Sequence, residues 1–309
     1  MFSDLQKPSS ELFYKSRDTD NTKMGDVVSD EPSDYDDAEF IIIGCPQDEG
    51  VRRNNGRVGA AAAPDAIRQI LYHCTAPPEL TAGAIVDLGN IIIADALEET
   101  HDIHAKVVTK ILADKKRLIV LGGGNDISYP DCLGLSKVHK NILALNIDSH
   151  FDVRENKVRN SGTPYRQLLE ENIIRLENFF ELAIQPFANS EIYWNYLESK
   201  SVSIHTLEQL LKQGIKKTLN SILDKNKCEA IFWGFDMDSV RSADAPGVSA
   251  SYATGLTAEE ILSIATIAGQ DSRSKILEIS EVNPKYDIDD KTVKLAAQII
   301  ICYLYSLAQ

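Results

Sequence analysis

The most constraining feature of the sequence is a short apolar run that ends in three regularly spaced polar residues. Residues 142–147 are typical of a buried parallel strand, and Asp148, His150 and Asp152 follow it directly. Side chains two residues apart on an extended chain share a face, so these three groups should emerge together at the carboxyl end of the strand. Charged groups leaving a buried strand need compensation, which a divalent cation would supply.

A second stretch repeats this pattern. Residues 229–235 are mostly apolar, and Asp236 and Asp238 place two more carboxylates on one face. For either stretch alone, a turn or a helix cap is the competing interpretation of Asp-x-Asp. Together, four aspartates and one histidine suit two adjacent hard divalent ions such as Mn²⁺. The two stretches therefore predict a dinuclear metal site.

Apolar segments alternate with amphipathic segments along the rest of the chain. This order predicts an α/β fold with about eight strands in a mostly parallel sheet that is covered by helices on both faces. The predicted strands are 40–44, 84–88, 117–121, 142–147, 179–184, 202–205, 229–235 and 275–279, and the predicted helices are 60–72, 100–113, 165–171, 191–198, 207–223, 257–268 and 289–307. Polar clusters follow four strands, at 122–126, 148–154, 236–238 and 281–284. Their convergence at one sheet edge predicts a single site.

Composition narrows the possible partners and the location. A net charge of −14 over 309 residues argues against nucleic acid, which needs a basic surface. Five scattered cysteines indicate reduced core thiols, and no segment resembles a signal peptide or a membrane span, so we expect a cytoplasmic protein without a membrane partner. Residues 1–37 predict an acidic, partly flexible extension with a solvated linker at 29–37, and residues 38–309 a single domain.

The spacing of the polar residues also suggests roles in the predicted site. We expect Asp148 and Asp236 to bridge the two ions, with His150 and Asp238 completing one shell and Asp152 the other. Ions held in this way lower the pKa of a shared water, and the resulting hydroxide attacks an electrophilic carbon. Glu281 could pair with a cationic substrate head, although a helix-capping or surface role is the alternative.

Four motifs in this order resemble the ureohydrolase superfamily, which comprises arginase, agmatinase and formimidoylglutamase. They are Gly-Gly-Gly-Asn-Asp (122–126), Asp-Ser-His-Phe-Asp (148–152), Phe-Asp-Met-Asp (235–238) and Glu-Val-Asn-Pro (281–284). Segments 48–57, 160–166 and 245–250 are most similar to formimidoylglutamase. The resemblance implies an arginase-like three-layer α/β/α fold with an eight-stranded sheet, two Mn²⁺ per chain, a homo-oligomer, and hydrolysis of N-formimino-L-glutamate to L-glutamate and formamide in histidine degradation.

Two positions depart from the wider superfamily pattern. Asn125 stands where the pattern usually has histidine, which predicts a weak ligand or an outer contact and one weakened ion site. Ser161 stands where arginases carry a histidine that helps move protons, which argues against arginase activity. A urea-releasing guanidino or amidine hydrolase, and a metal-depleted non-catalytic homologue, remain alternatives.

A substrate with two carboxylates needs cationic partners in a protein this acidic. Arginine forks bind carboxylates in a bidentate manner, and Arg154, then Arg52, are the first candidates. Asn54, Arg57 and Ser161 complete the predicted substrate-binding set, while Arg53 and Arg166 also lie in the predicted site loops. Structural ion pairs, and a plain basic surface loop at 48–57, are the alternatives. The remaining histidines are expected to be core or surface residues, and the redox role of Cys45 is open.

Overall fold

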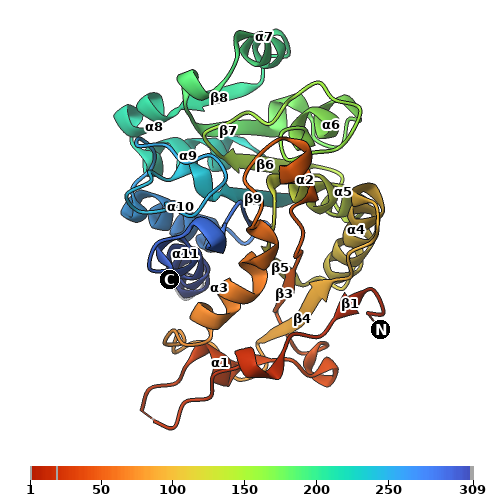
Figure 1. Ribbon diagram of the computed structural model, residues 1–309, viewed down its shortest axis with the longest axis vertical. Helices are drawn as coiled ribbons and strands as arrows, with labels where there is room; N and C mark the ends of the chain where they lie inside the picture. The colour runs from red at the N-terminus through yellow and green to blue at the C-terminus, as the bar shows by residue number, and fades with distance from the viewer. Residues whose placement is uncertain (1, 19, 307–309) are drawn as a thin grey trace.

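A computed structural model describes residues 2–18 and 20–306 and has three layers (Figure 1). A ten-stranded sheet lies between two layers of helices, in the order β1-β4-β3-β5-β10-β9-β6-β7-β8, with β2 also paired to β4. All of these described pairs are parallel except β1 with β4. The predicted α/β/α class and mostly parallel sheet are therefore confirmed.

Eight of the strands correspond to the predicted ones. They are β3 (Phe40–Gly44), β4 (Ile85–Ile91), β5 (Arg117–Leu121), β6 (Ile142–Ile147), β7 (Phe179–Ile184), β8 (Ser203–Thr206), β9 (Ala230–Asp236) and β10 (Ser274–Ser280). Every residue of β3, β5, β6, β7 and β9 is buried, because helices cover both faces of the sheet. The count of eight was too low, since β1 (Leu5–Gln6) and β2 (Val28–Ser29) add two short strands.

Two hydrophobic cores form where the helix layers pack against the two faces of the sheet. One core includes α3 (Ala63–Leu71), α8 (Leu207–Gln213), α9 (Ile215–Lys225), α10 (Ala258–Gln270) and α11 (Lys291–Tyr305). The other includes α4 (Leu97–Ala113), α5 (Ser128–Val138), α6 (Pro164–Glu170) and α7 (Glu191–Ser199). Along β6, Leu143 and Leu145 enter the first core while Ile142 and Ala144 enter the second, as strand alternation requires.

Three helical segments differ from the prediction. Helix α5 was missed because Pro130 and Gly134 interrupt its sequence signal; a Cβ at Gly134 would lie 2.6 Å from the Val108 side chain, so glycine allows α5 to approach α4 closely. The helix predicted at 207–223 is two helices, separated at Gly214 by a φ of +88°. The loop predicted at 48–57 contains the short helix α2 (Glu49–Arg53). Leu307, the end of the last predicted helix, lies outside the described residues.

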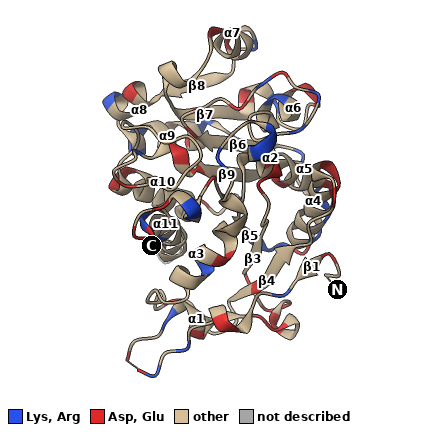
Figure 2. Cartoon of the chain, in the orientation of Figure 1, with Lys and Arg blue, Asp and Glu red and all other residues tan. Residues whose placement is uncertain are grey.

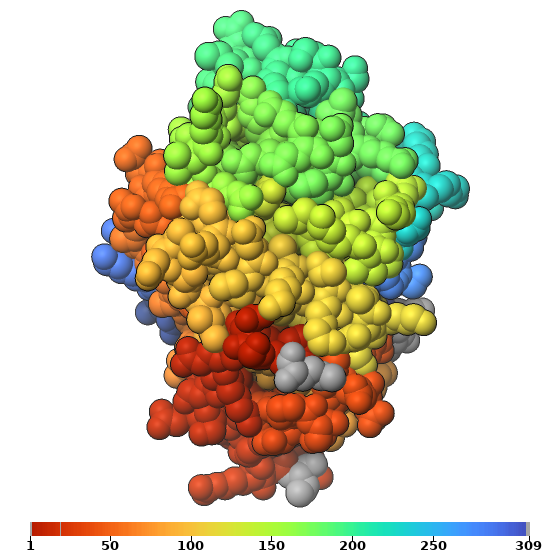
Figure 3. Space-filling model, turned by 90° about the vertical axis from the view of Figure 1, so that its right-hand side faces the viewer, coloured from red at the N-terminus to blue at the C-terminus, as the bar shows by residue number. Residues whose placement is uncertain are grey.

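The N-terminal extension packs against the body instead of remaining fully solvated. Figure 3 shows its described residues, red to orange, directly below α4. Met24 in α1 (Met24–Val27) is buried, and Tyr35, inside the predicted linker, is also buried and donates to Asp114 at 2.8 Å. Phe13 stacks on Tyr72 with ring centroids 4.8 Å apart. The division at residue 37 stays a prediction.

The surface charges, the hydropathy of the helices and the state of the cysteines can be compared with the expectations from composition. Lys and Arg are interspersed with Asp and Glu on the outer helices α4, α6 and α8 (Figure 2). Within the described ranges, no helix combines the length and the hydropathy needed to cross a membrane. All five cysteines are free, and burial raises the pKa of the Cys45 thiol, which disfavours the reactive thiolate.

Candidate metal centre

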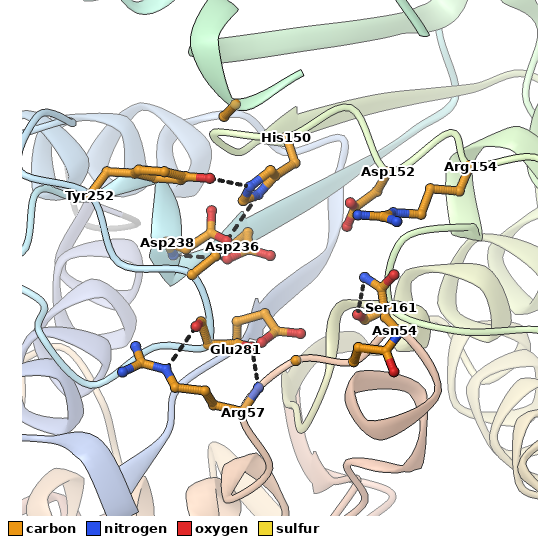
Figure 4. A pocket seen from close by; sticks show the side chains of 15 residues that line it. Asn54, Arg57, His150, Asp152, Arg154, Ser161, Asp236, Asp238, Tyr252 and Glu281 are labelled. Carbon is orange, nitrogen blue, oxygen red and sulfur yellow. Dashed lines mark hydrogen bonds and ion pairs between the residues drawn. The ribbon is translucent and has the colours of Figure 1, made fainter. Parts of the chain in front are cut away.

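Five adjacent strands of the sheet, β3, β5, β10, β9 and β6, deliver polar segments to one edge. A cavity of about 350 Å³ lies at this edge (Figure 4). The side chains labelled in Figure 4 that line it are Asn54, Arg57, His150, Asp152, Arg154, Ser161, Asp236, Asp238, Tyr252 and Glu281. Segments far apart in the sequence therefore meet at the predicted position.

The five predicted ligands form two overlapping groups. In each group, one potential ligand atom per residue lies within 4.8 Å of the others: Asp148, His150 and Asp238 form the first group, and Asp148, Asp152 and Asp236 the second. The Nδ1 atom of His150 lies 3.0 Å from Asp238 Oδ2 and 3.5 Å from Asp148 Oδ1. Asp148 belongs to both groups, as a bridging carboxylate would.

The local backbone aims these carboxylates inward. Asp148 Oδ1 accepts the His150 N–H at 2.7 Å, and Asp236 Oδ1 accepts the Asp238 N–H at 2.8 Å. Each of these two aspartates thus closes a turn with one oxygen, as the turn interpretation expected. Asp152 and Glu281 have φ values of +47° and +61°, a left-handed backbone that costs about 1–3 kcal/mol and is concentrated at functional sites.

The electrostatics of the cluster fit a cationic occupant. Burial, and then the charge of neighbouring carboxylates, raises the pKa of Asp148 and of Asp152 to about 7 and that of Asp236 and Glu281 well above the ordinary value. Among the described residues, Asp238 Oδ1 and Glu281 Oε2 are buried and have no hydrogen-bond partner. A hard, oxygen-rich donor set with one imidazole suits Mn²⁺, so these residues fit the predicted metal.

These raised pKa values predict how stability depends on pH. Between the unfolded value of 3.8 and about 7, the folded protein binds more protons at Asp148 and Asp152 than the unfolded chain does. The metal-free protein should therefore lose stability as pH rises from 5 to 8. Mn²⁺ competes with these protons, so its stabilising effect should grow over the same range. Thermal unfolding with and without Mn²⁺ tests this, and equal Mn²⁺ effects at both pH values would contradict it.

Asn125 contacts the ligands through its amide nitrogen. Its Nδ2 donates to Asp152 at 2.7 Å and to Asp148 at 3.3 Å, while its Oδ1 accepts from the hydroxyls of Ser128 and Ser280. Its backbone N–H donates to Glu281 Oε1 at 3.0 Å. This arrangement matches the outer-contact alternative better than direct ligation, because the oxygen that would bind a cation is turned away.

Replacing this amide by imidazole should strengthen metal binding. In Asn125→His, a neutral ring nitrogen next to Asp148 and Asp152 can ligate, so Mn²⁺ affinity should rise by about 1–3 kcal/mol, the usual cost of leaving a buried polar position without a good partner. Calorimetric titration of metal-free protein measures this. Unchanged affinity would mean that position 125 does not reach the ion.

The predicted substrate-binding residues divide between the cavity and the surface. The Arg154 side chain lies across Gly162, where a Cβ would come within 2.6 Å of it, and its guanidinium has no ion-pair or hydrogen-bond partner in the described part of the chain. Arg57 donates to the carbonyls of residues 248 and 249, and Asn54 donates to Ser161 Oγ at 3.0 Å. Of the six predicted substrate-binding residues, these four and Glu281 line the cavity, and Arg52 does not.

The other candidate arginines are used elsewhere. Arg52 does not line the cavity; its side chain is 65% exposed and paired with Glu49. Arg53 binds Glu49 and Glu98, and Arg166 binds Glu170 and lies over the Tyr196 ring. The ion-pair alternative therefore describes these three arginines, whose partners lie at helical spacing or come from other elements.

Two of the remaining histidines are buried behind the site. His101 Nε2 lies 2.7 Å from Asp126 Oδ2, and His104 lies 2.8 Å from Asp131. Asp126 also accepts from Gln47, whose own oxygen accepts the N–H of Glu49 at the start of α2. His101 and His104 are therefore core residues, as expected. The hydrogen bond from Gln47 to Asp126 links the 122–126 segment to the loop that carries Asn54 and Arg57.

Tyr252 also lines the cavity and was not expected from the sequence. Tyr252 follows the turn-rich segment 239–251, and its hydroxyl lies 3.0 Å from His150 Nε2. No spacing or charge pattern marks this tyrosine, because the loop that carries it has no periodic structure. Its position becomes apparent only from the folded chain.

Comparison with known proteins agrees with this geometry. The model of the arginase family matches residues 38–305, so the chain belongs to the arginase family. Within that family it is similar to proteins named formimidoylglutamase: the one from Staphylococcus carnosus is 33% identical over 269 residues, covering 85% of each chain.

Two solved structures are also similar. Formiminoglutamase from Trypanosoma cruzi with Mn²⁺ has a TM-score of 0.86 at 29% identity, covering 94% of this chain and 99% of that one. Formimidoylglutamase from Bacillus subtilis has a TM-score of 0.86 at 30% identity, covering 96% and 95%.

Proposed function

We propose that the protein hydrolyses N-formimino-L-glutamate to L-glutamate and formamide with two Mn²⁺ ions. The observation that carries this proposal is that one small cavity, lined by four of the five predicted ligands, also contains two groups of opposite charge that are available to a substrate. These are the carboxylate oxygen Glu281 Oε2 and the guanidinium of Arg154. The similarity to formimidoylglutamases across 85% of the chain supports the same substrate.

The proposed substrate carries a cationic formimino head and two carboxylates, which match these groups. Glu281 Oε2 accepts an N–H of the formimino group, since its other oxygen is already bound to the Asn125 N–H. Arg154 holds a carboxylate in a bidentate manner, and the Ser161 hydroxyl, which accepts from Asn54, keeps its own proton for donation to a substrate oxygen. The cavity of about 350 Å³ suits a ligand of amino-acid size.

Asp148, His150, Asp152, Asp236 and Asp238 would hold the ions. When bound, Mn²⁺ supplies Lewis acidity and lowers the pKa of water at the site. In the overall reaction, water adds to the formimino carbon, and the bond from that carbon to the glutamate nitrogen breaks. The carbon leaves as formamide, and the glutamate nitrogen gains the proton. Asp152 lines the cavity as well, so it would contribute to catalysis as a ligand that holds an ion beside the substrate.

An activity screen tests the proposal. Full-length protein loaded with Mn²⁺ should release formamide from N-formimino-L-glutamate, and a chelator should abolish the release. The same protein should release little urea from arginine, agmatine or guanidinobutyrate. Urea as the main product would support a guanidino hydrolase instead. Less than one Mn²⁺ per chain after dialysis, with no product from any substrate, would support a non-catalytic homologue.

A further inference from the structure

The two ring nitrogens of His150 face different environments (Figure 4). Nδ1 lies among the carboxylates, 3.0 Å from Asp238 Oδ2, while Nε2 lies 3.0 Å from the hydroxyl of Tyr252. A neutral imidazole binds a metal through its unprotonated nitrogen and carries its proton on the other one. Nδ1 is the nitrogen placed to ligate, so its use requires the proton to be on Nε2, where Tyr252 is the neighbour.

We infer that Tyr252 is a positioning residue for the metal site, through the hydrogen bond of its hydroxyl to His150 Nε2. This inference rests on the proposed Mn²⁺ site. When Nδ1 ligates, the tyrosine oxygen accepts a hydrogen bond from the Nε2–H group and so stabilises the tautomer that carries its proton on Nε2. Before metal binding, Nδ1 can donate to Asp238 while Nε2 keeps the same contact with the Tyr252 hydroxyl, so the ring stays in place in both states.

The position of Tyr252 is itself fixed by the end of β7. Gln185, directly after β7, accepts from the Thr254 hydroxyl at 2.7 Å and donates to the Thr254 carbonyl at 3.0 Å. The same Gln185 amide donates to Ser149, whose hydroxyl donates to the carbonyl of Asp238. The loop that carries Tyr252 is therefore tied to the two segments that carry the ligands.

Aromatic contacts hold the tyrosine ring over the histidine. The Tyr252 ring lies 5.6 Å from the His150 ring, and the edge of Phe187 meets Tyr252 at 5.3 Å with an interplanar angle of 78°. These contacts depend on the ring and not on the hydroxyl. Tyr252→Phe therefore removes the hydrogen bond to Nε2 while keeping the packing, which separates the positioning role from a structural one.

The deciding measurement is Mn²⁺ affinity, by calorimetric titration of the metal-free full-length protein. Tyr252→Phe should weaken binding by about 10–100-fold, the usual effect of removing an outer partner of a ligating histidine. Its melting temperature without metal should match that of the unsubstituted protein. Tyr14→Phe is the matched control, because Tyr14 also stacks on a histidine, His73, but lies outside the cavity; its Mn²⁺ affinity should not change.

A second readout follows the histidine proton directly. With diamagnetic Zn²⁺ in place of Mn²⁺, the ¹⁵N shifts of His150 should report a protonated Nε2 in the unsubstituted protein. Mn²⁺ affinity of Tyr252→Phe within about threefold of the unsubstituted value, or ligation through Nε2, would overturn the inference. If the unsubstituted protein binds no Mn²⁺, both the proposed function and this inference fail. If the unsubstituted protein binds Mn²⁺ and the variant binds it equally well, only the proposed role of Tyr252 fails.

Discussion

Replacing Asp236 by asparagine should abolish activity and at the same time stabilise the metal-free protein. Asp236 is buried among Asp238, Asp148, Glu281 and Asp152, and its pKa is raised by burial and then by these charges. An amide keeps the hydrogen bond from the Asp238 N–H, removes one buried negative charge, and can donate to the other carboxylates. The substitution therefore stabilises the metal-free protein and weakens metal binding.

The expected sizes are large enough to measure clearly. The kcat/KM for N-formimino-L-glutamate should fall at least about 1,000-fold, since even outer contacts to ligands typically cost 10–100-fold. At pH 8 the melting temperature of the metal-free protein should rise by about 2–4 °C for each kcal/mol of relieved repulsion. The stabilisation by Mn²⁺, about 2.7 kcal/mol at 100 times Kd for the unsubstituted chain, should disappear.

A matched control separates this effect from a general loss of charge. Asp102→Asn removes one carboxylate whose side chain is 76% exposed, so activity and melting temperature should stay unchanged. If Asp236→Asn retained Mn²⁺ binding and most of its activity, Asp236 would not be a ligand. If its metal-free form melted at a lower temperature, repulsion among the carboxylates would not be what limits the stability of the metal-free site.

Arg154→Gln should weaken substrate use without changing metal binding. The guanidinium of Arg154 lies at the cavity with no partner among the described residues, so it is available for a substrate carboxylate. Losing a charge-assisted pair costs about 1.5–3 kcal/mol, which corresponds to roughly 10–150-fold in kcat/KM, mainly through KM. Arg154→Lys should recover only part of this loss, because an ammonium cannot form the bidentate fork.

Arg52→Gln is the control for Arg154, because both residues were predicted to bind substrate. Arg52 is exposed and bound to Glu49, so its replacement should leave KM and kcat within about twofold, as expected for a surface pair of small energy. Steady-state kinetics of the three variants, with Mn²⁺ affinity measured beside them, complete the test. Equal effects of Arg52→Gln and Arg154→Gln would show that local charge alone, and not the cavity geometry, governs KM.

The sequence was most informative where side chains alternate along buried strands. The aspartates and the histidine after β6 and β9 were predictable, because a strand fixes the direction of every second side chain and parallel strands end at one edge. The convergence of the polar segments after β5, β6, β9 and β10, which brings Glu281 beside Asn125, follows from the same rule. Those positions depend on local geometry that the residues themselves determine.

The parts that were missed depend on contacts between distant segments. The pairing of Arg52 with Glu49, three residues away, was visible in the sequence, whereas the place of Arg154 beside Gly162 becomes apparent only in the folded loop. Tyr252 reaches His150 because Gln185 ties down its loop, which no local pattern reveals. The two-residue strands β1 and β2 are too short to show alternation, and helix α5, largely buried at its start, shows no clear polar face.

The two short strands at the N-terminus have a consequence for the whole molecule. Both occupy the outer side of β4, with Leu5 opposite Ile91 and Val28 opposite Ile85. An uncovered β4 would present free backbone N–H and C=O groups to the edge strand of another copy. Removal of the acidic segment should therefore expose β4 to edge-to-edge pairing between copies, and would also remove negative charge that repels them.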